Sequence, residues 1–235
     1  MKNKILFSCG IICYILSTIL IGYYLVLEFS IIDLTSPLER LKIILLVIIL
    51  MYIGSYLLNK SSTKKLFKLS KINLWIWFAL YIVMLLNLTL FDQYFGRTGI
   101  AMISNTTNQF REYLANNFNI IPFATINNYF IALKNHNLSN ATFIYNIFGN
   151  LLAFAPFAFF VPRLFNSVDK WFKFFFVTSI FIIIIETMQM ITMSGSFDID
   201  DYILNIMGAN ILYVIINNKY LKKYIDSFIY LEYLQ

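Results

Sequence analysis

Six long apolar segments restrict this chain to one class of fold. They occupy residues 5–27, 41–58, 72–91, 145–165, 172–192 and 201–217. Most approach the roughly 20 residues that a helix needs to cross the hydrocarbon core of a bilayer, while the second and the last are short. Hydrophobic residues make up 60% of the chain and charged residues only 13%, well below the charged fraction of a soluble domain. We therefore predict an all-α polytopic membrane protein with six transmembrane helices.

The distribution of charge predicts the orientation of these helices. Most of the 18 Lys and Arg lie before the first segment, between the second and third, between the fourth and fifth, or after the sixth. Positively charged loops face the cytoplasm. We therefore expect a multi-pass membrane protein with both termini in the cytoplasm. The largest basic group comprises Lys60, Lys64, Lys65, Lys68 and Lys71.

The same pattern divides the chain into three regions. Residues 1–91 form an N-terminal three-helix membrane region, 92–144 an external loop, and 145–235 a C-terminal three-helix membrane region. Within the loop, Gln109–Asn117 can form a short helix. The semi-apolar stretch 119–133 suits an interfacial or re-entrant segment.

Two local signals refine the predicted helices. In the second segment, Ser36-Pro37-Leu38-Glu39 places Ser at the N-cap, Pro at the first helical position and Glu at the third, which is a capping box. In the fourth segment, Pro156 removes the helical hydrogen-bond donor of a preceding carbonyl and should kink the helix.

The fourth segment also carries a polar face. Asn146 and Asn150 are spaced i, i+4 and therefore share one face of a helix. Gly149 lies beside them and is expected to allow the close approach of a neighbouring backbone. The two asparagines either hold helices together by hydrogen bonds or contribute to a site.

The fifth segment places a carboxylate deep in the predicted membrane. Glu186 and Gln189 are spaced i, i+3 near its outer end, and Glu186 lies about 20 Å above Lys173 at about 1.5 Å per residue. An ionised carboxylate that faced lipid there would cost several kcal/mol. Glu186 must therefore face protein, water, a cation or a ligand, or be protonated.

The sequence FDIDDYILNIMG, residues 197–208, leads into the sixth segment. Three carboxylates, Asp198, Asp200 and Asp201, directly precede its apolar part. Asp201, Asn205 and Gly208 follow at i, i+4 and i+7, so they share a face. Either Asp200 or Asp201 could simply be the N-cap of the sixth helix. Of the three, we expect Asp200 to be such a cap or a solvated group, and Asp198 and Asp201 to belong to a site.

Several other chemistries find no support in the sequence. Cys9 and Cys13 lie one helical turn apart in the first apolar segment, where they are packing or lipid-facing residues. The single histidine, His136, falls in the external loop, so no Ser–His or Cys–His arrangement is visible. Neither a phosphate-binding loop nor a nucleic-acid motif occurs. We expect no cofactor and no metal site of standard spacing, although the Asp and Glu cluster could hold a divalent cation.

Four sequence blocks, in this order and spacing, resemble one family. These are NIIPF at 119–123, NIFGNLLAFAPFAFFVP at 146–162, ETMQ at 186–189 and FDIDDYILNIMG at 197–208. Together they resemble the VanZ-like bacterial membrane proteins over roughly residues 115–217. Two positions depart from the family pattern, since Ala158 stands where Gly is expected and Gly195 where Arg is expected.

The resemblance implies an association with low-level resistance to glycopeptide antibiotics, especially lipid-tailed teicoplanin. It supplies no settled reaction. Our first hypothesis is a protein that binds a lipid-linked cell-wall precursor or a lipoglycopeptide at a polar pocket in the outer leaflet. Its partners would be membrane lipids and not nucleic acid, and its oligomeric state is open. The candidate binding residues are Asn119, Asn146, Asn150, Gln189 and Asn205.

Two alternatives use the same polar residues. In the first, the protein is an enzyme that acts on such a lipid, with Glu186, Asp198 and Asp201 as candidate acid and base. In the second, it is a small transporter subunit, although no inverted repeat is visible.

Overall fold

The computed structural model describes residues 2–29, 36–61, 67–92 and 107–230. Lys64 and Lys65 of the basic loop, and the first part of the segment 92–144, lie outside the described residues. Helices make up 84% of the structure. Only one pair of two-residue strands accompanies them among the described residues.

Six helices of the described residues are long and apolar enough to span a membrane, which confirms the all-α polytopic fold. The second is longer than expected, because the helix begins directly after the predicted N-cap Ser36. The Glu39 N–H donates to Ser36 Oγ over 3.4 Å. The sixth stays short, at 18 residues. The spans are Asn3–Phe29, Pro37–Ser61, Leu69–Phe91, Asn140–Leu164, Trp171–Thr192 and Ile199–Ile216.

The chain folds into two compact units. Unit 1 comprises residues 1–85 and 219–235, and unit 2 comprises residues 86–218. These units reflect packing, whereas the three regions predicted above describe membrane topology, and that topology stays a prediction. Unit 1 contains α1 (Lys2–Phe29), α2 (Pro37–Ser61), nearly all of α3 (Phe67–Leu86) and α10 (Lys219–Ile229).

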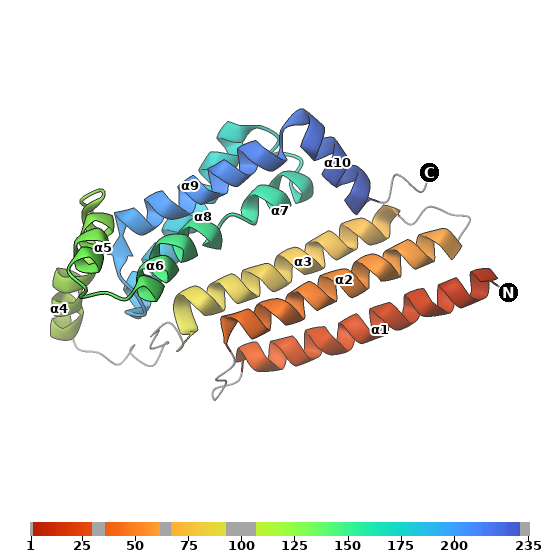
Figure 1. The fold of residues 1–235 in the computed structure, drawn as a ribbon, viewed down its shortest axis with the longest axis horizontal. Coiled ribbons are helices and arrows are strands. Elements are labelled where there is room, and N and C mark those ends of the chain that lie inside the picture. Colours follow the sequence, from red (N-terminus) through yellow and green to blue (C-terminus); the bar gives the residue numbers. More distant parts are fainter. Residues whose placement is uncertain (1, 30–35, 62–66, 93–106, 231–235) are drawn as a thin grey trace. The chain divides into compact units, whose positions relative to one another are not determined.

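Helices α1 and α2 of unit 1 pack closely where two glycines meet (Figure 1). A Cβ added to Gly54 would lie 2.9 Å from the ring of Tyr14 and 3.2 Å from the carbonyl oxygen of Gly10. Tyr14 also reaches the other helices, because its hydroxyl bonds Ser55 Oγ at 2.7 Å and donates to Asn73 Oδ1 at 3.0 Å. One polar network therefore links α1, α2 and α3.

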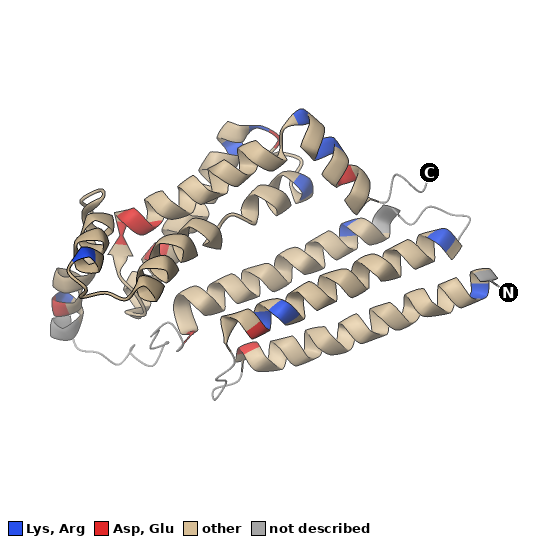
Figure 2. Ribbon diagram, in the orientation of Figure 1, with Lys and Arg blue, Asp and Glu red and all other residues tan. Residues whose placement is uncertain are grey.

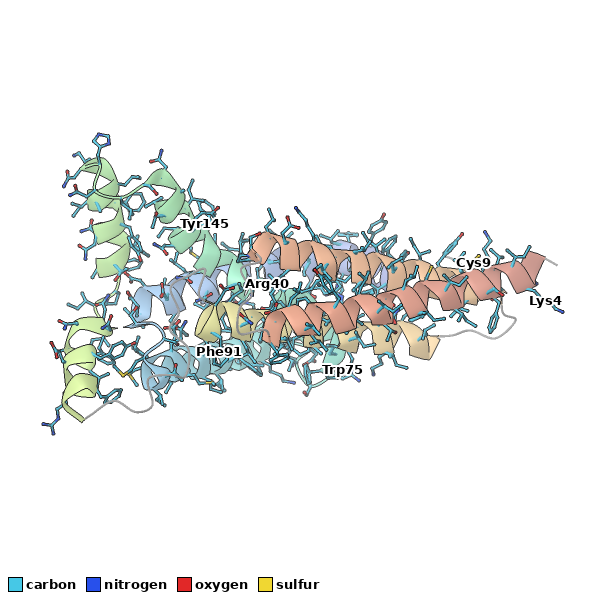
Figure 3. The ribbon with its side chains drawn as sticks, turned by 90° about the horizontal axis from the view of Figure 1, so that it is seen from below. Lys4, Cys9, Arg40, Trp75, Phe91 and Tyr145 are labelled. Carbon is cyan, nitrogen blue, oxygen red and sulfur yellow. The ribbon has the colours of Figure 1, made fainter. Side chains whose placement is uncertain are left out.

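Unit 1 also buries an ion pair. Arg40 Nη1 lies 3.3 Å from Glu28 Oε2, and the two side chains are 5% and 0% exposed. Arg40 is near the start of α2, at the opposite end of unit 1 from Lys4 (Figure 3). The pair therefore joins the end of α1 to the beginning of α2.

Helix α10 is an element that the sequence analysis missed. It is amphipathic, and the ring of its Phe228 stacks on Tyr52 of α2 with centroids 4.7 Å apart. Tyr220 and Tyr224 stay exposed beside its lysines. Eleven residues are too few to cross a bilayer, so a search for spans passes over such a helix.

Unit 2 contains η1 (Asn87–Phe91), a π-helix that continues α3, followed by six α-helices and two short strands. Helices α8 and α9 run antiparallel, and α6 packs against α9 (Figure 1). Phe157, Phe174 and Ile182 are fully buried in this unit. Its remaining elements are α4 (Thr107–Asn117), β1 (Phe118–Asn119), α5 (Ala124–Lys134), α6 (Asn140–Ala153), α7 (Phe157–Leu164), α8 (Trp171–Thr192), β2 (Phe197–Asp198) and α9 (Ile199–Ile216).

The fourth span is broken in two rather than only kinked. Helix α6 ends at Ala153 and α7 begins at Phe157, so the interruption falls at Pro156 as the sequence predicts. The carbonyl of Leu152, which cannot receive a bond from Pro156, accepts one from the Ala155 N–H at 3.2 Å. The Leu152 carbonyl therefore keeps a hydrogen-bond donor despite the break.

Pro162 creates a second orphan carbonyl, inside α7, at Ala158. The side-chain amide of Asn217, just after α9, donates to this oxygen over 2.9 Å. Arg163 Nη1 donates to the carbonyl of Phe159 at 3.0 Å and to Asn217 Oδ1 at 3.4 Å. Arg163 is only 6% exposed. It lies in the last turn of α7, where its charge also favours the helix C-terminus.

Candidate functional site

A short parallel bridge brings two of the sequence blocks together. Strands β1 and β2 pair Phe118 with Phe197 and Asn119 with Asp198. The two phenylalanine rings stack with centroids 5.2 Å apart. The NIIPF block therefore lies directly beside the start of the FDIDD block, although about 80 residues separate them along the chain.

Asp198 is the residue that caps α9. Its Oδ1 accepts the Asp200 N–H at 2.9 Å, which satisfies one of the N-terminal donors of the helix. The same oxygen accepts Asn119 Nδ2 at 3.1 Å, and Oδ2 accepts the Thr125 hydroxyl at 2.5 Å. Both oxygens of this buried carboxylate thus serve the fold, as does the Asn119 amide.

Asp200 is neither a cap of its own helix nor solvated, so that prediction is wrong. Its side chain reaches across to α5 and accepts three backbone N–H groups: Phe123 at 2.5 Å, Thr125 at 2.8 Å and Ile126 at 3.0 Å. Asp200 is 0% exposed. A helix N-terminus carries unsatisfied N–H groups and a partial positive charge, and both stabilise a carboxylate.

The turn before α5 explains why these donors need an external acceptor. The Ala124 N–H donates to the Ile121 carbonyl at 3.3 Å, and Phe123 has φ 66° and ψ 4°. This is the geometry of a type II turn, which usually takes Gly or Asn at that position. A phenylalanine there costs on the order of 1–3 kcal/mol and offers no side-chain cap. Asp200 supplies the missing acceptor.

The next residue of the helix, Asp201, joins α9 to α6. Asn150 Nδ2 donates to Asp201 Oδ1, and Asn146 lies one turn earlier on the same face of α6. Asp201 and both asparagines are half-buried. The structure thus brings together the polar faces predicted for the fourth and sixth segments.

Close packing beside this pair depends on Gly208, not on Gly149. A Cβ added to Gly208 would lie 1.7 Å from the carbonyl oxygen of Leu151, whereas one added to Gly149 meets nothing within 4 Å. The expectation for Gly149 is therefore wrong. The two glycines are indistinguishable by sequence, because the rotation of α6 decides which residue faces its neighbour.

The polar pair of α8 divides between two environments. Gln189 is 4% exposed, and its Nε2 donates to the carbonyl of Thr89 in η1 at 2.9 Å. Its backbone carbonyl accepts the Ser194 N–H at 3.0 Å, where the chain leaves α8. Gln189 therefore anchors η1 to α8. Glu186 is 5% exposed and faces the protein interior, as expected for a membrane carboxylate.

Side-chain contacts limit the alignment of α8 and α9 to within about two helical turns. The rings of Phe174 and Tyr213 stack at 4.4 Å, and Trp171 Nε1 donates to Asn210 Oδ1 at 2.7 Å. In an antiparallel pair, twelve residues on from Phe174 is Glu186, and twelve back from Tyr213 is Asp201. Glu186 therefore lies level with the start of α9, to within about two helical turns.

Asn205 lies one turn below Asp201 on α9. It is 4% exposed, and its Oδ1 has no hydrogen-bond partner among the described residues. An amide oxygen buried in this way costs about 1–3 kcal/mol unless a ligand or water satisfies it. Of the predicted site residues, Asn205 thus has the clearest unfilled bonding capacity.

The structure therefore separates the eight candidates into two groups. Asn119, Asp198 and Gln189 hold local structure together, with Asp200 and Thr125 as partners that the sequence analysis did not identify. The other five come from α6, α8 and α9, and we call them the polar cluster: Asn146, Asn150, Glu186, Asp201 and Asn205. Figure 2 shows acidic residues gathered at the start of α9. Across the described part of the chain, no three His, Cys, Asp or Glu side chains could share a metal ion.

One signal in the sequence could have revealed the role of Asp200. The α5 helix begins after Ile-Pro-Phe, which contains no residue able to cap it. An uncapped helix start requires an acceptor from elsewhere, and FDIDD holds more carboxylates than one helix needs.

Comparison with known proteins identifies the family of the chain. No curated protein and no solved structure matches the chain. A sequence model of the VanZ/LLP1 family matches residues 78–221, which include η1, the bridge and all of the polar cluster. The chain therefore belongs to the VanZ/LLP1 family.

Proposed function

We propose that this protein binds a lipid-linked or lipid-tailed amphiphile through the polar cluster of α6, α8 and α9. The family is linked to antibiotic resistance. Binding of a lipid-tailed glycopeptide such as teicoplanin, or of the lipid-linked cell-wall precursor, would protect a cell by sequestering the drug or by altering access to its target.

The observation that carries this proposal is the buried, unpartnered Oδ1 of Asn205. It lies one turn from the Asn150–Asp201 pair and near the end of an apolar span. An amphiphile satisfies both environments, because its headgroup can donate hydrogen bonds to amide and carboxylate oxygens while its tail stays among apolar side chains.

The proposed orientation places the polar cluster on the outer side of the membrane and both termini in the cytoplasm. The charge distribution of unit 2 supports it. Asp198, Asp200 and Asp201 stand at the start of α9, whereas Lys170 and Lys173 stand at the start of α8 and Arg163 in the last turn of α7. Figure 2 shows acidic residues at the start of α9. Since α8 and α9 are antiparallel, Lys170 and Lys173 stand at the opposite end of the pair from Asp198, Asp200 and Asp201, and the positive-inside rule assigns the lysine end to the cytoplasm.

The direct test measures binding of fluorescent teicoplanin, and of the same glycopeptide without its acyl tail, to purified protein in detergent. We expect Asn205→Leu and Asp201→Asn each to weaken binding of the tailed compound about tenfold, equivalent to about 1.4 kcal/mol. Asp169→Asn is the matched control, because Asp169 is exposed and pairs only with Lys173 among the described residues. Equal binding by all four proteins would refute the proposal.

A reaction on the same lipid is the second candidate. It is supported by the approximate alignment of Glu186 with the start of α9, where Asp201 lies. Glu186 is almost fully buried and Asp201 is half-buried. Carboxylates in different surroundings can divide acid and base roles. Asp198 suits such a role poorly, since both its oxygens accept structural hydrogen bonds. Mass spectrometry of envelope lipids incubated with the protein, with and without chelator, would reveal any product.

A further inference from the structure

We infer that the turn at residues 118–123 is a membrane anchor that inserts its apolar side chains into the bilayer at the N-terminal end of α9. This interaction surface is separate from the polar cluster. Its partner is the lipid bilayer itself, at the boundary between headgroups and acyl chains.

The first observation is the exposure of the turn. Ile120, Ile121 and Phe123 are 61%, 67% and 61% exposed, and Phe118 is 48% exposed. No charged residue occurs from Phe118 to Leu133. A contiguous apolar surface of this kind is unfavourable in water and marks an interaction site.

The second observation is that this exposure is held in place. Asp200 accepts three N–H groups from the turn and the first residues of α5, and Asp198 bonds both Asn119 and Thr125. The αL conformation of Phe123 would suit glycine better. A mere connection would have no need to fix an exposed phenylalanine against that preference, whereas an anchor must present its apolar side chains in a defined direction.

The third observation is depth. The turn is bonded to the first residues of α9, which is 18 residues long and hence spans about 27 Å at about 1.5 Å per residue. The hydrocarbon core of a bilayer is about 30 Å thick. The first turn of α9 thus lies near one boundary of that core, and the residues bonded to it are held at the same boundary. Lipid, which already surrounds the span, is continuous with the turn and covers its side chains.

Spin labels can measure this depth directly. In a Cys9→Ala/Cys13→Ala background, single labels at Ile121→Cys and Phe123→Cys would be reconstituted into vesicles of equal parts phosphatidylglycerol and phosphatidylethanolamine. Asn137→Cys is the control, because Asn137 is exposed in the polar connection after α5. We expect collisions with oxygen, which partitions into lipid, to exceed collisions with a water-soluble nickel complex at 121 and 123. The order should reverse at 137.

Accessibility at 121 and 123 equal to that at 137 would overturn the proposal. Spectral broadening that grows with the protein-to-lipid ratio would also overturn it, because it would show that a second copy covers the turn. Both labelled positions are exposed. Ile121, unlike Phe123, does not have the αL conformation, so its label tests depth even if Phe123→Cys misfolds. Binding of teicoplanin by the labelled proteins would be measured separately. The proposed function is tested by that binding and the membrane anchor by label depth, so either can fail without the other.

Discussion

The two units of the molecule each bury a carboxylate, but they neutralise it in different ways. In unit 1, Glu28 pairs with the side chain of Arg40. In unit 2, Asp200 accepts three backbone N–H groups at the start of α5. A side-chain pair can be replaced on both sides, because neither partner is part of the backbone. Backbone donors cannot be removed, so the acceptor at position 200 has no equivalent substitute.

The largest expected loss of stability comes from adding a side chain where two helices pack closely. Gly208→Ala should destabilise the protein by more than about 3 kcal/mol, because the new Cβ would meet the backbone of Leu151, which cannot rotate away. Gly54→Ala in unit 1 should cost less, since its nearest contacts at 2.9 Å are atoms of the Tyr14 ring. Unfolding by SDS in mixed micelles would measure both changes.

Gly149→Ala is the matched control for these variants. Its Cβ would meet nothing within 4 Å, so the greater helix propensity of alanine should leave stability equal or slightly increased. A loss at Gly149 as large as that at Gly208 would contradict the packing of α6 on α9.

The second prediction tests whether the ion pair of unit 1 is replaceable. Arg40→Met should cost about 3 kcal/mol, because it leaves the Glu28 carboxylate buried without its cation. The double variant Glu28→Gln/Arg40→Met should recover most of that loss. If the double variant were as unstable as the sum of the single ones in the same unfolding measurement, the two side chains would not be coupled.

The third prediction applies the same logic to unit 2. Asp200→Asn should cost about 2 kcal/mol, because one amide oxygen replaces two charged acceptors and the NH₂ group opposes backbone donors. Hydrogen exchange at the start of α5 should rise selectively, while Asp169→Asn should change neither quantity. Unchanged protection of the Thr125 and Ile126 amides in Asp200→Asn would contradict the role of Asp200 as the acceptor of these N–H groups.

The smallest expected effect is in the polar network of unit 1. Tyr14→Phe removes the hydroxyl that bonds Ser55 and Asn73, and should cost about 1 kcal/mol, the usual size of interhelical hydrogen bonds in membranes. Its thermal stability in detergent, measured beside that of the exposed Tyr220→Phe, would show whether the network is worth even this much.

The sequence predicted the six spans because apolar length is a property of each segment alone. It also predicted where the fourth span is distorted, since the effect of Pro156 is local, although it predicted a kink and the helix is interrupted. What it could not show was rotation and long-range pairing. The choice between Gly149 and Gly208, and the reach of Asp200 to the amides near Phe123, depend on how helices face one another. Helix α10 was missed because its eleven residues are too few to cross a bilayer.

The hydrogen bonds from the start of α5 to Asp200 have a consequence for biosynthesis. Asp200 follows Phe123 by 77 residues, so at about 5–20 residues per second a ribosome needs roughly 4–15 seconds to deliver it. During that interval the N–H groups at the start of α5 lack the Asp200 carboxylate as acceptor, and Phe197, the bridge partner of Phe118, has not yet been synthesised. The segment can therefore settle only after the last span has been inserted, which makes the final helix the step that completes unit 2.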